Sequence, residues 1–309
     1  MPSVTVAIIT CNRQAGLEKL LSALLQLRFP TFPTTQCRVV VVENGAKLAA
    51  EAQVKRYRER GLDVIYAHEP TPGISYARNR AMDHAMHMGE YFAFIDDDEY
   101  PDPVWLDALL SCAISTNASV VRGPVLPVYP EGAPAWAEAG GFFRRERFPT
   151  GTVVKYGACN NVLIRSELLR DSGLRFNARF ALTGGEDTLL FLQLCEQTKV
   201  KIIWCDTAVV FEDLPLDRLS SAWLVRRVMR EGANMPQYDA VIGKSRFFRL
   251  RWTLQGLAHI ATALPLQVRS LFGDELQRIR SRRELALGVG MIRGSFGGEI
   301  NEYGERHDA

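Results

Sequence analysis

Apolar residues follow two different spacings in the first two thirds of the chain. Val4–Thr10 and Cys37–Val42 are short, largely apolar runs with many β-branched side chains, as expected of buried strands. Between these runs, one face of a helix is predicted by Leu17, Leu20, Leu21, Leu24 and Leu25. The chain therefore opens with a strand, a helix and a second strand.

The same alternation continues toward the C-terminus. Further strands are expected at Leu62–Ala67, Phe92–Ile95, Ser119–Val128, Val200–Trp204 and Ala208–Phe211, and ordered structure is expected to resume at Val153–Ile164. Further helices are expected at Leu48–Arg60, Ile74–Met88, Trp105–Thr116 and after Asp187. Strands that alternate with helices are joined by βαβ crossovers, so the pattern predicts an α/β domain with a mostly parallel central sheet flanked by helices. Residues 130–150 lack periodicity and contain several prolines, which indicates a long surface loop suited to acceptor contact or lid closure.

The last third of the chain has a different character. From about Leu219 it predicts helices rich in Arg, Trp, Phe and Leu, so we expect a catalytic domain at 1–217 and a helical C-terminal region at 218–309. Residues 218–283 contain 13 Lys or Arg against 4 Asp or Glu, although the whole chain has a net charge of only +2. Leu254–Val268 lacks these charged residues but is too short for a membrane span of about 20 residues. An amphipathic helix on an anionic membrane surface fits this pattern, and a helix packed on the catalytic domain is the alternative.

Composition excludes several other classes of protein. The six cysteines are scattered, without the paired spacing of a zinc or redox site. The N-terminus enters a strand pattern at Val4 without the features of a signal peptide, so we expect a cytoplasmic protein with free thiols. No helix-turn-helix, RNP or zinc-finger pattern accompanies the basic region, and a nucleic-acid partner is not expected.

Four consecutive carboxylates follow the predicted strand Phe92–Ile95: Asp96, Asp97, Asp98 and Glu99. Like charges this close raise each other's pKa or require a counter-ion. An all-oxygen cluster suits a hard divalent cation such as Mg²⁺ or Mn²⁺, and the carboxyl end of a strand is where open α/β sheets bind ligands. A solvated acidic turn before the next helix is the structural alternative.

Other polar residues also follow predicted strands or begin predicted helices. Thr10, Asn12 and Arg13 come after the first strand, and Glu43 and Asn44 come after the second. Two glycine-containing segments, 73–80 and 184–187, each begin a helix. Because the carboxyl ends of parallel strands meet at one edge of a sheet, we expect these groups to converge there with the acidic turn.

Taken together in this order, the segments resemble the family 2 glycosyltransferases with the GT-A fold, and more narrowly the bacterial exopolysaccharide glycosyltransferases of the ExoM type. The matching segments are Val6–Arg13, Val41–Asn44, Ala77–Asn79, Phe94–Glu99, Gly184–Asp187 and Trp223–Arg227. The resemblance implies a nucleoside diphosphate sugar as donor and a divalent metal, Mn²⁺ or Mg²⁺, as cofactor.

The first two strand ends are candidate contacts to the nucleotide. Thr10, Asn12 and Arg13 offer a hydroxyl, an amide and a guanidinium, a mixture able to hold a nucleotide. Glu43 can accept a ring N–H of uracil or a ribose hydroxyl, and the resemblance implies this role, although the family more often has Asp there. Considered alone, Glu43 fits a helix N-cap equally well.

The third strand end and the helix before it supply further candidates. Arg78 stands near the start of a helix, where a cation beside backbone N–H groups suits a pyrophosphate. The family pattern makes Asp96 the nucleotide-sugar contact, with Asp97 supporting it. It makes Asp98 the metal ligand.

The segment Gly184–Asp187 is the candidate catalytic element. Its carboxylates lie in the first turn of a helix, where the dipole favours the ionised form that a general base requires. By position in the family motif we assign the base to Asp187 and an orienting role to Glu186. Glu212, Arg226 and Arg227 are candidate supports for the diphosphate or metal, and for the two arginines a solvated basic face is the alternative.

These assignments predict an inverting, metal-dependent glycosyltransferase that moves a hexose, UDP-linked in our expectation, to a glycan acceptor that is lipid-linked or free. The Gln-x-x-Arg-Trp sequence of processive relatives is absent, which favours a single addition. A non-catalytic nucleotide-sugar-binding or membrane scaffold protein is one alternative. A sugar nucleotidyltransferase is another, but it would need a glycine-rich loop after the first strand, and Thr10–Gly16 contains a single glycine.

Overall fold

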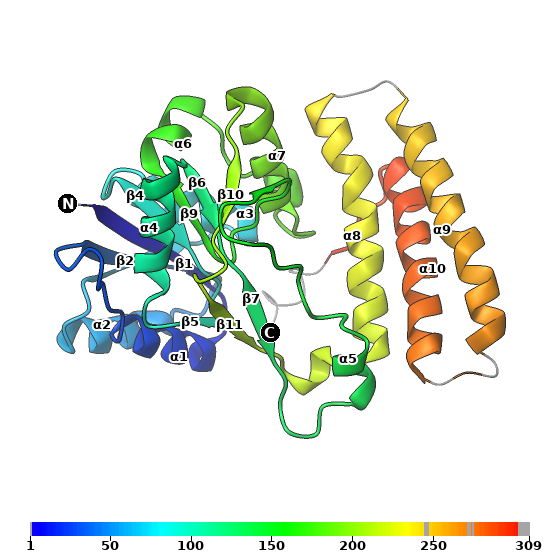
Figure 1. Ribbon diagram of the computed structural model, residues 1–309, viewed down its shortest axis with the longest axis horizontal. Helices are drawn as coiled ribbons and strands as arrows, with labels where there is room; N and C mark the ends of the chain where they lie inside the picture. Colours follow the sequence, from blue (N-terminus) through cyan, green and yellow to red (C-terminus); the bar gives the residue numbers. More distant parts are fainter. Residues whose placement is uncertain (1, 244–246, 271–272, 274, 302–309) are drawn as a thin grey trace. The chain divides into compact units, whose positions relative to one another are not determined.

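The computed structural model describes residues 2–243, 247–270, 273 and 275–301, which form two compact units (Figure 1). The first unit contains the chain up to Pro127 and from Arg145 to Asp213. The second contains Val128–Arg144 and the described residues from Leu214 to Asn301. The division after Asp213 lies close to the predicted boundary at residue 217, whereas the sequence did not indicate that Val128–Arg144 leaves the first unit. Residues 302–309 of the predicted C-terminal region lie outside the described residues.

The first unit is built around an eight-stranded sheet with the order β3-β2-β1-β4-β9-β6-β10-β8. Its strands are β1 (Ser3–Thr10), β2 (Gln36–Asn44), β3 (Val64–Glu69), β4 (Tyr91–Phe94), β6 (Val120–Arg122), β8 (Val153–Val154), β9 (Val162–Arg165) and β10 (Ile202–Trp204). The first four strands are mutually parallel, and β6 is parallel to β10. β9 runs antiparallel between β4 and β6, and β8 runs antiparallel to β10. The predicted α/β class with a mostly parallel central sheet is confirmed.

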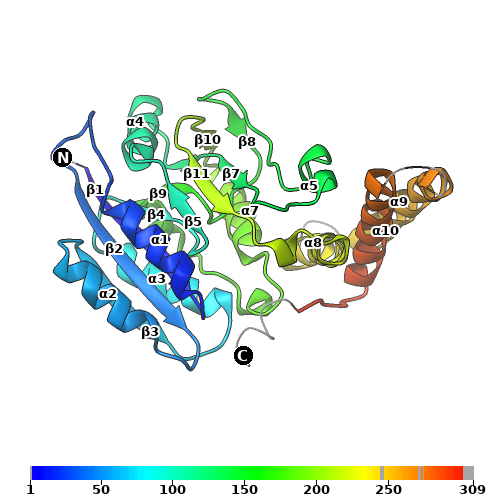
Figure 2. The ribbon, with the colours of Figure 1, turned by 90° about the horizontal axis from the view of Figure 1, so that it is seen from below.

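Helices cover both faces of this sheet (Figure 2). One layer contains α1 (Gln14–Leu24), α2 (Ala50–Glu59) and α4 (Trp105–Thr116), and the other contains α3 (Ile74–Ala85), α6 (Ser166–Ser172) and α7 (Glu186–Thr198). Alternate residues of β1 enter the two cores: Val6 and Ile8 pack with the first layer, and Ala7 packs with the second. Burial on both faces explains why the strands read as continuous apolar runs.

The predicted strand Ser119–Val128 is split in the structure, which corrects the prediction. Ser119–Val128 contains β6 and β7 (Val125–Val128), separated by Gly123 and Pro124. A Cβ atom at Gly123 would lie 2.3 Å from the carbonyl oxygen of Ala208, and Pro124 has no N–H for a ladder. Val153–Ile164 contains β8 and β9 with a loop between them. β7 joins β5 (Glu99–Pro101) and β11 (Val210–Asp213) in a separate three-stranded sheet.

The second unit consists mainly of α8 (Ser221–Ile242), α9 (Phe248–Ser270) and α10 (Glu275–Ser295), with α10 packed against both other helices (Figure 1). Glycines allow the close approach. Cβ atoms at Gly290 and Gly294 would each lie 2.1 Å from a carbonyl oxygen of α8. The predicted surface loop also contains a short helix, α5 (Ala135–Ala139), whose Trp136 is buried in a cluster with residues of α8 and α10.

Candidate active site

Neighbouring parallel strands end at one edge of the sheet, where the candidate residues lie. Thr10 ends β1 and is paired in register with Glu43 of β2. Phe94 ends β4 beside Ala7 of β1, and the acidic turn follows directly. The topology therefore brings the first, second and fourth strand ends to the same edge, as the sequence predicted.

The connection from β1 to α1 holds the acidic turn closely. Asn12 has a φ of +54°, in the left-handed region, which tightens this connection. A Cβ atom at Gly16 in α1 would lie 2.4 Å from the carbonyl oxygen of Asp97, so only glycine permits this approach. The backbone of the acidic turn is thus packed on the first turn of α1.

Thr10 and Arg13 hold the middle of the acidic turn. The Thr10 hydroxyl donates a hydrogen bond of 2.8 Å to Asp97, and Arg13 forms ion pairs of 2.9 Å with Asp97 and 2.7 Å with Asp98. Burial raises the pKa of Asp97 to about 6, although Arg13 opposes this shift. The contacts give Asp97 a structural position below the turn, whereas Asp98 remains about a quarter exposed.

Arg78 is the buried cation at the centre of the site. Its Nη1 donates to Glu186, its Nη2 donates to Asp96 at 3.1 Å, and Asp187 lies 3.9 Å from Nη1. Burial alone would lower the pKa of Arg78, but the charges of Glu186, Asp96 and Asp187 outweigh burial and raise it well above its usual value. Arg78 therefore connects the acidic turn to the predicted catalytic helix.

The two carboxylates that begin α7 differ in exposure. The Glu186 side chain is 1% exposed, and burial raises its pKa to about 7 against the opposing charge of Arg78. The Asp187 side chain is 20% exposed and accepts hydrogen bonds from the backbone N–H groups of Cys159 and Thr188. Gly185, with a φ of +90°, makes the turn that places both groups here. Of the pair, Asp187 is the one that a second substrate can reach.

Glu43 has a structural role in addition to the predicted nucleotide contact. One carboxylate oxygen accepts hydrogen bonds from the backbone N–H groups of Ala49 and Ala50 at 2.9 and 3.0 Å, at the start of α2. The other accepts from the Tyr66 hydroxyl at 2.7 Å. These bonds match the helix-capping alternative, and the nucleotide contact stays a prediction.

A second carboxylate pair lies on the three-stranded sheet. Glu99 of β5 is paired in register with Glu212 of β11, and Arg145 forms an ion pair of 3.1 Å with Glu212. Burial raises the pKa of Glu99 well above its usual value, and Asp96 adds to the shift, whereas Arg145 lowers it. Glu212 thus lies close enough to the acidic turn to interact electrostatically with Glu99.

Sequence reasoning missed three residues of this region. The Asn161 amide donates to the carbonyl oxygens of Pro124 and Ala208 and accepts from the indole N–H of Trp105, below the end of β4. Arg145 lowers the pKa of Asp96, and Arg122 is a partly buried cation whose own pKa is lowered by burial and by the charge of Arg145. No sequence motif identifies these residues, because their contacts are with residues that are distant in the sequence.

The predicted supports Arg226 and Arg227 lie on α8, in the second unit. Arg227 pairs with Glu231 at 2.9 Å and lies over the Trp223 ring, and Arg226 is exposed. These contacts agree with the solvated basic face that was the alternative, and the diphosphate role stays a prediction.

The predicted metal site can be compared with the carboxylates that the structure places at the acidic turn. Within the described residues, no group of three or more His, Cys, Asp or Glu side chains is arranged to hold a metal ion. Asp96 and Asp98 nevertheless offer two partly exposed carboxylates, which are hard oxygen donors of the kind that Mn²⁺ and Mg²⁺ prefer. The donors fit a metal that takes its remaining ligands from a diphosphate and water.

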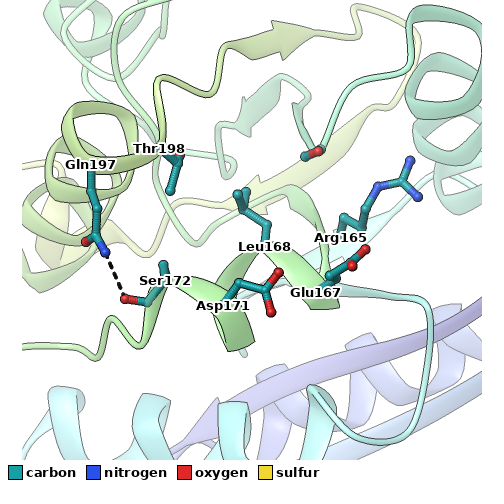
Figure 3. A pocket seen from close by; sticks show the side chains of 8 residues that line it. Arg165, Glu167, Leu168, Asp171, Ser172, Gln197 and Thr198 are labelled. Atoms are coloured by element: carbon teal, nitrogen blue, oxygen red, sulfur yellow. Dashed lines mark hydrogen bonds between the residues drawn. The ribbon is translucent and has the colours of Figure 1, made fainter.

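A separate surface cavity of about 360 Å³ lies at the opposite edge of the sheet (Figure 3). It is lined by residues of α6 and the end of α7, together with Arg165, which is paired with Tyr91 at the start of β4. Its residues form a hydrogen bond from Gln197 to the carbonyl oxygen of Ser172. Because this cavity lies away from the carboxyl ends of the parallel strands, it does not belong to the candidate active site.

Comparisons with known proteins identify relatives of the chain. Residues 5–173 match the glycosyl transferase family 2 domain. The chain is 32% identical over 312 residues to the succinoglycan biosynthesis protein ExoM of Rhizobium meliloti, covering 99% of this chain and 98% of ExoM. It is 25% identical over 175 residues to the glycosyltransferase AglE of Haloferax volcanii, covering 56% of each chain.

Solved structures give the same fold. The mannosyltransferase PcManGT of Pyrobaculum calidifontis, in complex with GDP-Man and Mn²⁺, superposes with a TM-score of 0.63 at 18% identity, covering 95% of this chain and 87% of that one. S. aureus TarS 1-349 in complex with UDP-GlcNAc superposes with a TM-score of 0.55 at 17% identity, covering 96% and 93%. The chain therefore has the GT-A fold and belongs to glycosyl transferase family 2.

Proposed function

We propose that this glycosyltransferase moves one hexose from a UDP-sugar to a hydroxyl of a lipid-linked glycan, with inversion at the anomeric carbon, in exopolysaccharide synthesis. The observation that carries the proposal is the Arg78 cluster. It holds a partly exposed carboxylate, Asp187, next to a buried charged network that reaches the acidic turn. ExoM supports the exopolysaccharide context, and TarS with UDP-GlcNAc supports the uridine nucleotide.

Asp187 is the proposed general base. It accepts the proton of the acceptor hydroxyl while that oxygen forms a bond to the anomeric carbon and the bond from that carbon to the diphosphate breaks. Two backbone N–H groups orient its carboxylate at the start of α7. Glu186 is too buried to meet an acceptor, so its role is to fix Arg78.

The departing diphosphate needs positive charge. Arg145 lies close enough to lower the pKa of Asp96, so it is a candidate cation from the first unit. A divalent ion held by Asp98 and Asp96 would supply further charge neutralisation when bound. Thr10, Asn12, Arg13 and Glu43, at the neighbouring strand ends, are the proposed contacts to the nucleoside.

The sequence lacks the Gln-x-x-Arg-Trp segment, which supports a single addition. The second unit is rich in arginine, which supports an acceptor at an anionic membrane surface. No described helix is long and apolar enough to cross a bilayer. We expect the enzyme to work at the cytoplasmic face of the membrane, where anionic lipids attract basic surfaces.

The first test is calorimetric titration of the protein with UDP, GDP and dTDP, each with and without Mn²⁺. We expect UDP to bind most tightly and only with the metal, and Asp98→Ala to lose most of this metal-dependent binding. Asp102→Ala, a neighbouring carboxylate that binds the Val104 backbone N–H, is the matched control. A protein that binds none of the nucleotides is not a glycosyltransferase of this kind.

A further inference from the structure

Helix α9 carries an apolar face that remains exposed. Its members are separated by four, three, seven and four residues, so they lie on one side of the helix. They are Leu250, Leu254, Leu257, Leu264 and Val268, with exposed fractions of 58%, 57%, 51%, 61% and 61%. Leucine and valine are normally buried, and so many on one exposed helix face mark an interaction surface.

The opposite side of α9 is the side that packs on α10. A Cβ atom at Gly256 would lie 2.7 Å from the carbonyl oxygen of Gly288, and the Ser281 hydroxyl contacts the carbonyl oxygen of Ala263 at 3.4 Å. Gln255 and Thr262 are exposed on the flank between these two sides. The apolar face is therefore not part of the helix-packing surface of the second unit.

α10 continues the exposed apolar surface beside α9. Leu285 and Val289 are 40% and 39% exposed, and Arg278 and Arg282 precede them at helical spacing on the same face. The other side of the α9–α10 pair lines a groove with Thr262. Since Thr262 faces that groove, Leu257 and Leu264 face the side that Leu285 and Val289 share.

Charge around this surface is mostly positive, although Arg251 is ion-paired with Asp239 and Glu275 is exposed at the start of α10. Between Trp252 and Val268 the sequence has no Asp, Glu, Lys or Arg. Arg249 and Arg251 are exposed just before this apolar stretch, and Arg278 and Arg282 border it on α10. Apolar side chains with a basic border complement a surface that is anionic outside and apolar a few ångströms below.

We propose that this surface docks the protein on an anionic lipid bilayer, with α9 lying in the plane of the membrane. The surface is Leu250, Leu254, Leu257, Leu264 and Val268 of α9 with Leu285, Val289, Arg278 and Arg282 of α10. The inference builds on the proposed lipid-linked acceptor, since it assigns the part of the molecule that meets the membrane. A bilayer that buries these leucines would remove from water most of the apolar area that α9 exposes.

A second copy of the chain is a less suitable occupant. The three-and-four spacing resembles a coiled-coil seam, but such seams are flanked by charges of both signs that pair between helices. Here the flanking residues include Thr253, Ala258 and Ile260, and the nearby charges on α9 are Arg249 and Arg251. Two such surfaces face to face would bring like charges together, whereas anionic lipid neutralises them.

The test is flotation of the full-length protein with vesicles of phosphatidylcholine alone or with phosphatidylglycerol added. We expect binding to the anionic vesicles that weakens with salt. Leu254→Glu with Leu257→Glu should weaken this binding by about tenfold or more, because two carboxylates replace the buried apolar contact. Gln255→Glu with Thr262→Glu is the matched control: it makes the same change in net charge on the flank of the same helix, and its binding should stay within about twofold of wild type.

Each outcome decides the proposal. Equal loss in both double variants would show that net charge alone governs binding and would overturn the apolar docking surface. Absence of flotation, with a dimer in solution that becomes monomeric in Leu254→Glu, Leu257→Glu, would assign the surface to a second copy. Titration with UDP and Mn²⁺ separates this result from the proposed function: a protein that binds UDP but not vesicles keeps its transferase assignment and loses only the docking surface.

Discussion

Arg78 shows how far a residue's role can be inferred from its motif. The sequence placed it near a helix start and suggested a pyrophosphate contact, and its helical neighbours offered no ion-pair partner. In the structure its partners are Asp96, Glu186 and Asp187, from two other elements. The buried guanidinium holds these carboxylates together. Removing it would leave like charges unpaired in a region shielded from water, which is strongly unfavourable.

Asp187→Asn tests the general base. The amide keeps the size of the side chain but cannot accept the hydroxyl proton, so we expect the transfer rate to fall by about 100- to 10,000-fold. UDP affinity in the presence of Mn²⁺ should change little. Product formation from a labelled UDP-sugar and calorimetric titration measure the two effects. Asp171→Asn, an exposed carboxylate far from the strand ends, is the control, and substantial transfer by Asp187→Asn would exclude this assignment.

Glu186 predicts a pH dependence of stability. Burial raises its pKa from 4.5 to about 7, so between these values the folded protein binds a proton that the unfolded chain releases. The free energy of unfolding contributed by this group therefore falls as pH rises from about 4.5 to about 7. In Glu186→Gln this contribution should be absent, and urea unfolding at several pH values measures it. A pH profile identical to wild type would show that Glu186 does not titrate in this range.

At the level of elements, the spacing of apolar residues predicted the strands and helices whose burial depends on their own sequence. β1 to β4 and the helices between them follow from apolar runs and leucine spacing, because their burial is set by the residues themselves. The gap between β6 and β7 was missed although Pro124 signals it in the sequence, and only the close approach of Ala208 to Gly123 depends on the fold. The same holds for the site. Thr10 and the acidic turn could be predicted because they lie at the ends of predicted strands, whereas Arg145 and Glu212 are distant in the sequence and only the folded chain brings them together.

Gly290→Ala tests the close packing of α8 and α10. In an isolated helix this change is stabilising by about 1 kcal/mol. Here the added Cβ would lie 2.1 Å from the carbonyl oxygen of Met229, so we expect a net loss of about 1–3 kcal/mol in the free energy of unfolding. Urea denaturation followed by circular dichroism measures it. Val289→Ala, at the exposed adjacent position, should change stability by less than about 0.5 kcal/mol. A stabilised Gly290→Ala protein would mean that the helices lie farther apart.

At the scale of the whole molecule, the chain enters the second unit twice. Val128–Arg144 interrupts the first unit and supplies Trp136 and Phe143 to the core that α8 and α10 share. Trp136 is 6% exposed, and Phe143 stacks on Trp223 of α8 with ring centroids 6.1 Å apart. A segment that the sequence indicated as a loop is therefore part of a hydrophobic core. The sequence did not predict this, because the apolar residues of the segment have no periodicity and pack only against helices distant in the sequence.

Trp136→Ala should consequently destabilise the second unit selectively. Removing a buried indole typically costs about 3–5 kcal/mol, which would speed amide hydrogen exchange in α8 and α10. Exchange in β1, β2 and β4 should stay as in wild type, because their core contains no residue of the Trp136 cluster. Leu190→Ala, which opens the core beside α7, should give the reverse pattern, with faster exchange in the first unit. Mass-spectrometric exchange resolves both regions, and uniform acceleration across the chain in either variant would show that the two units unfold as one.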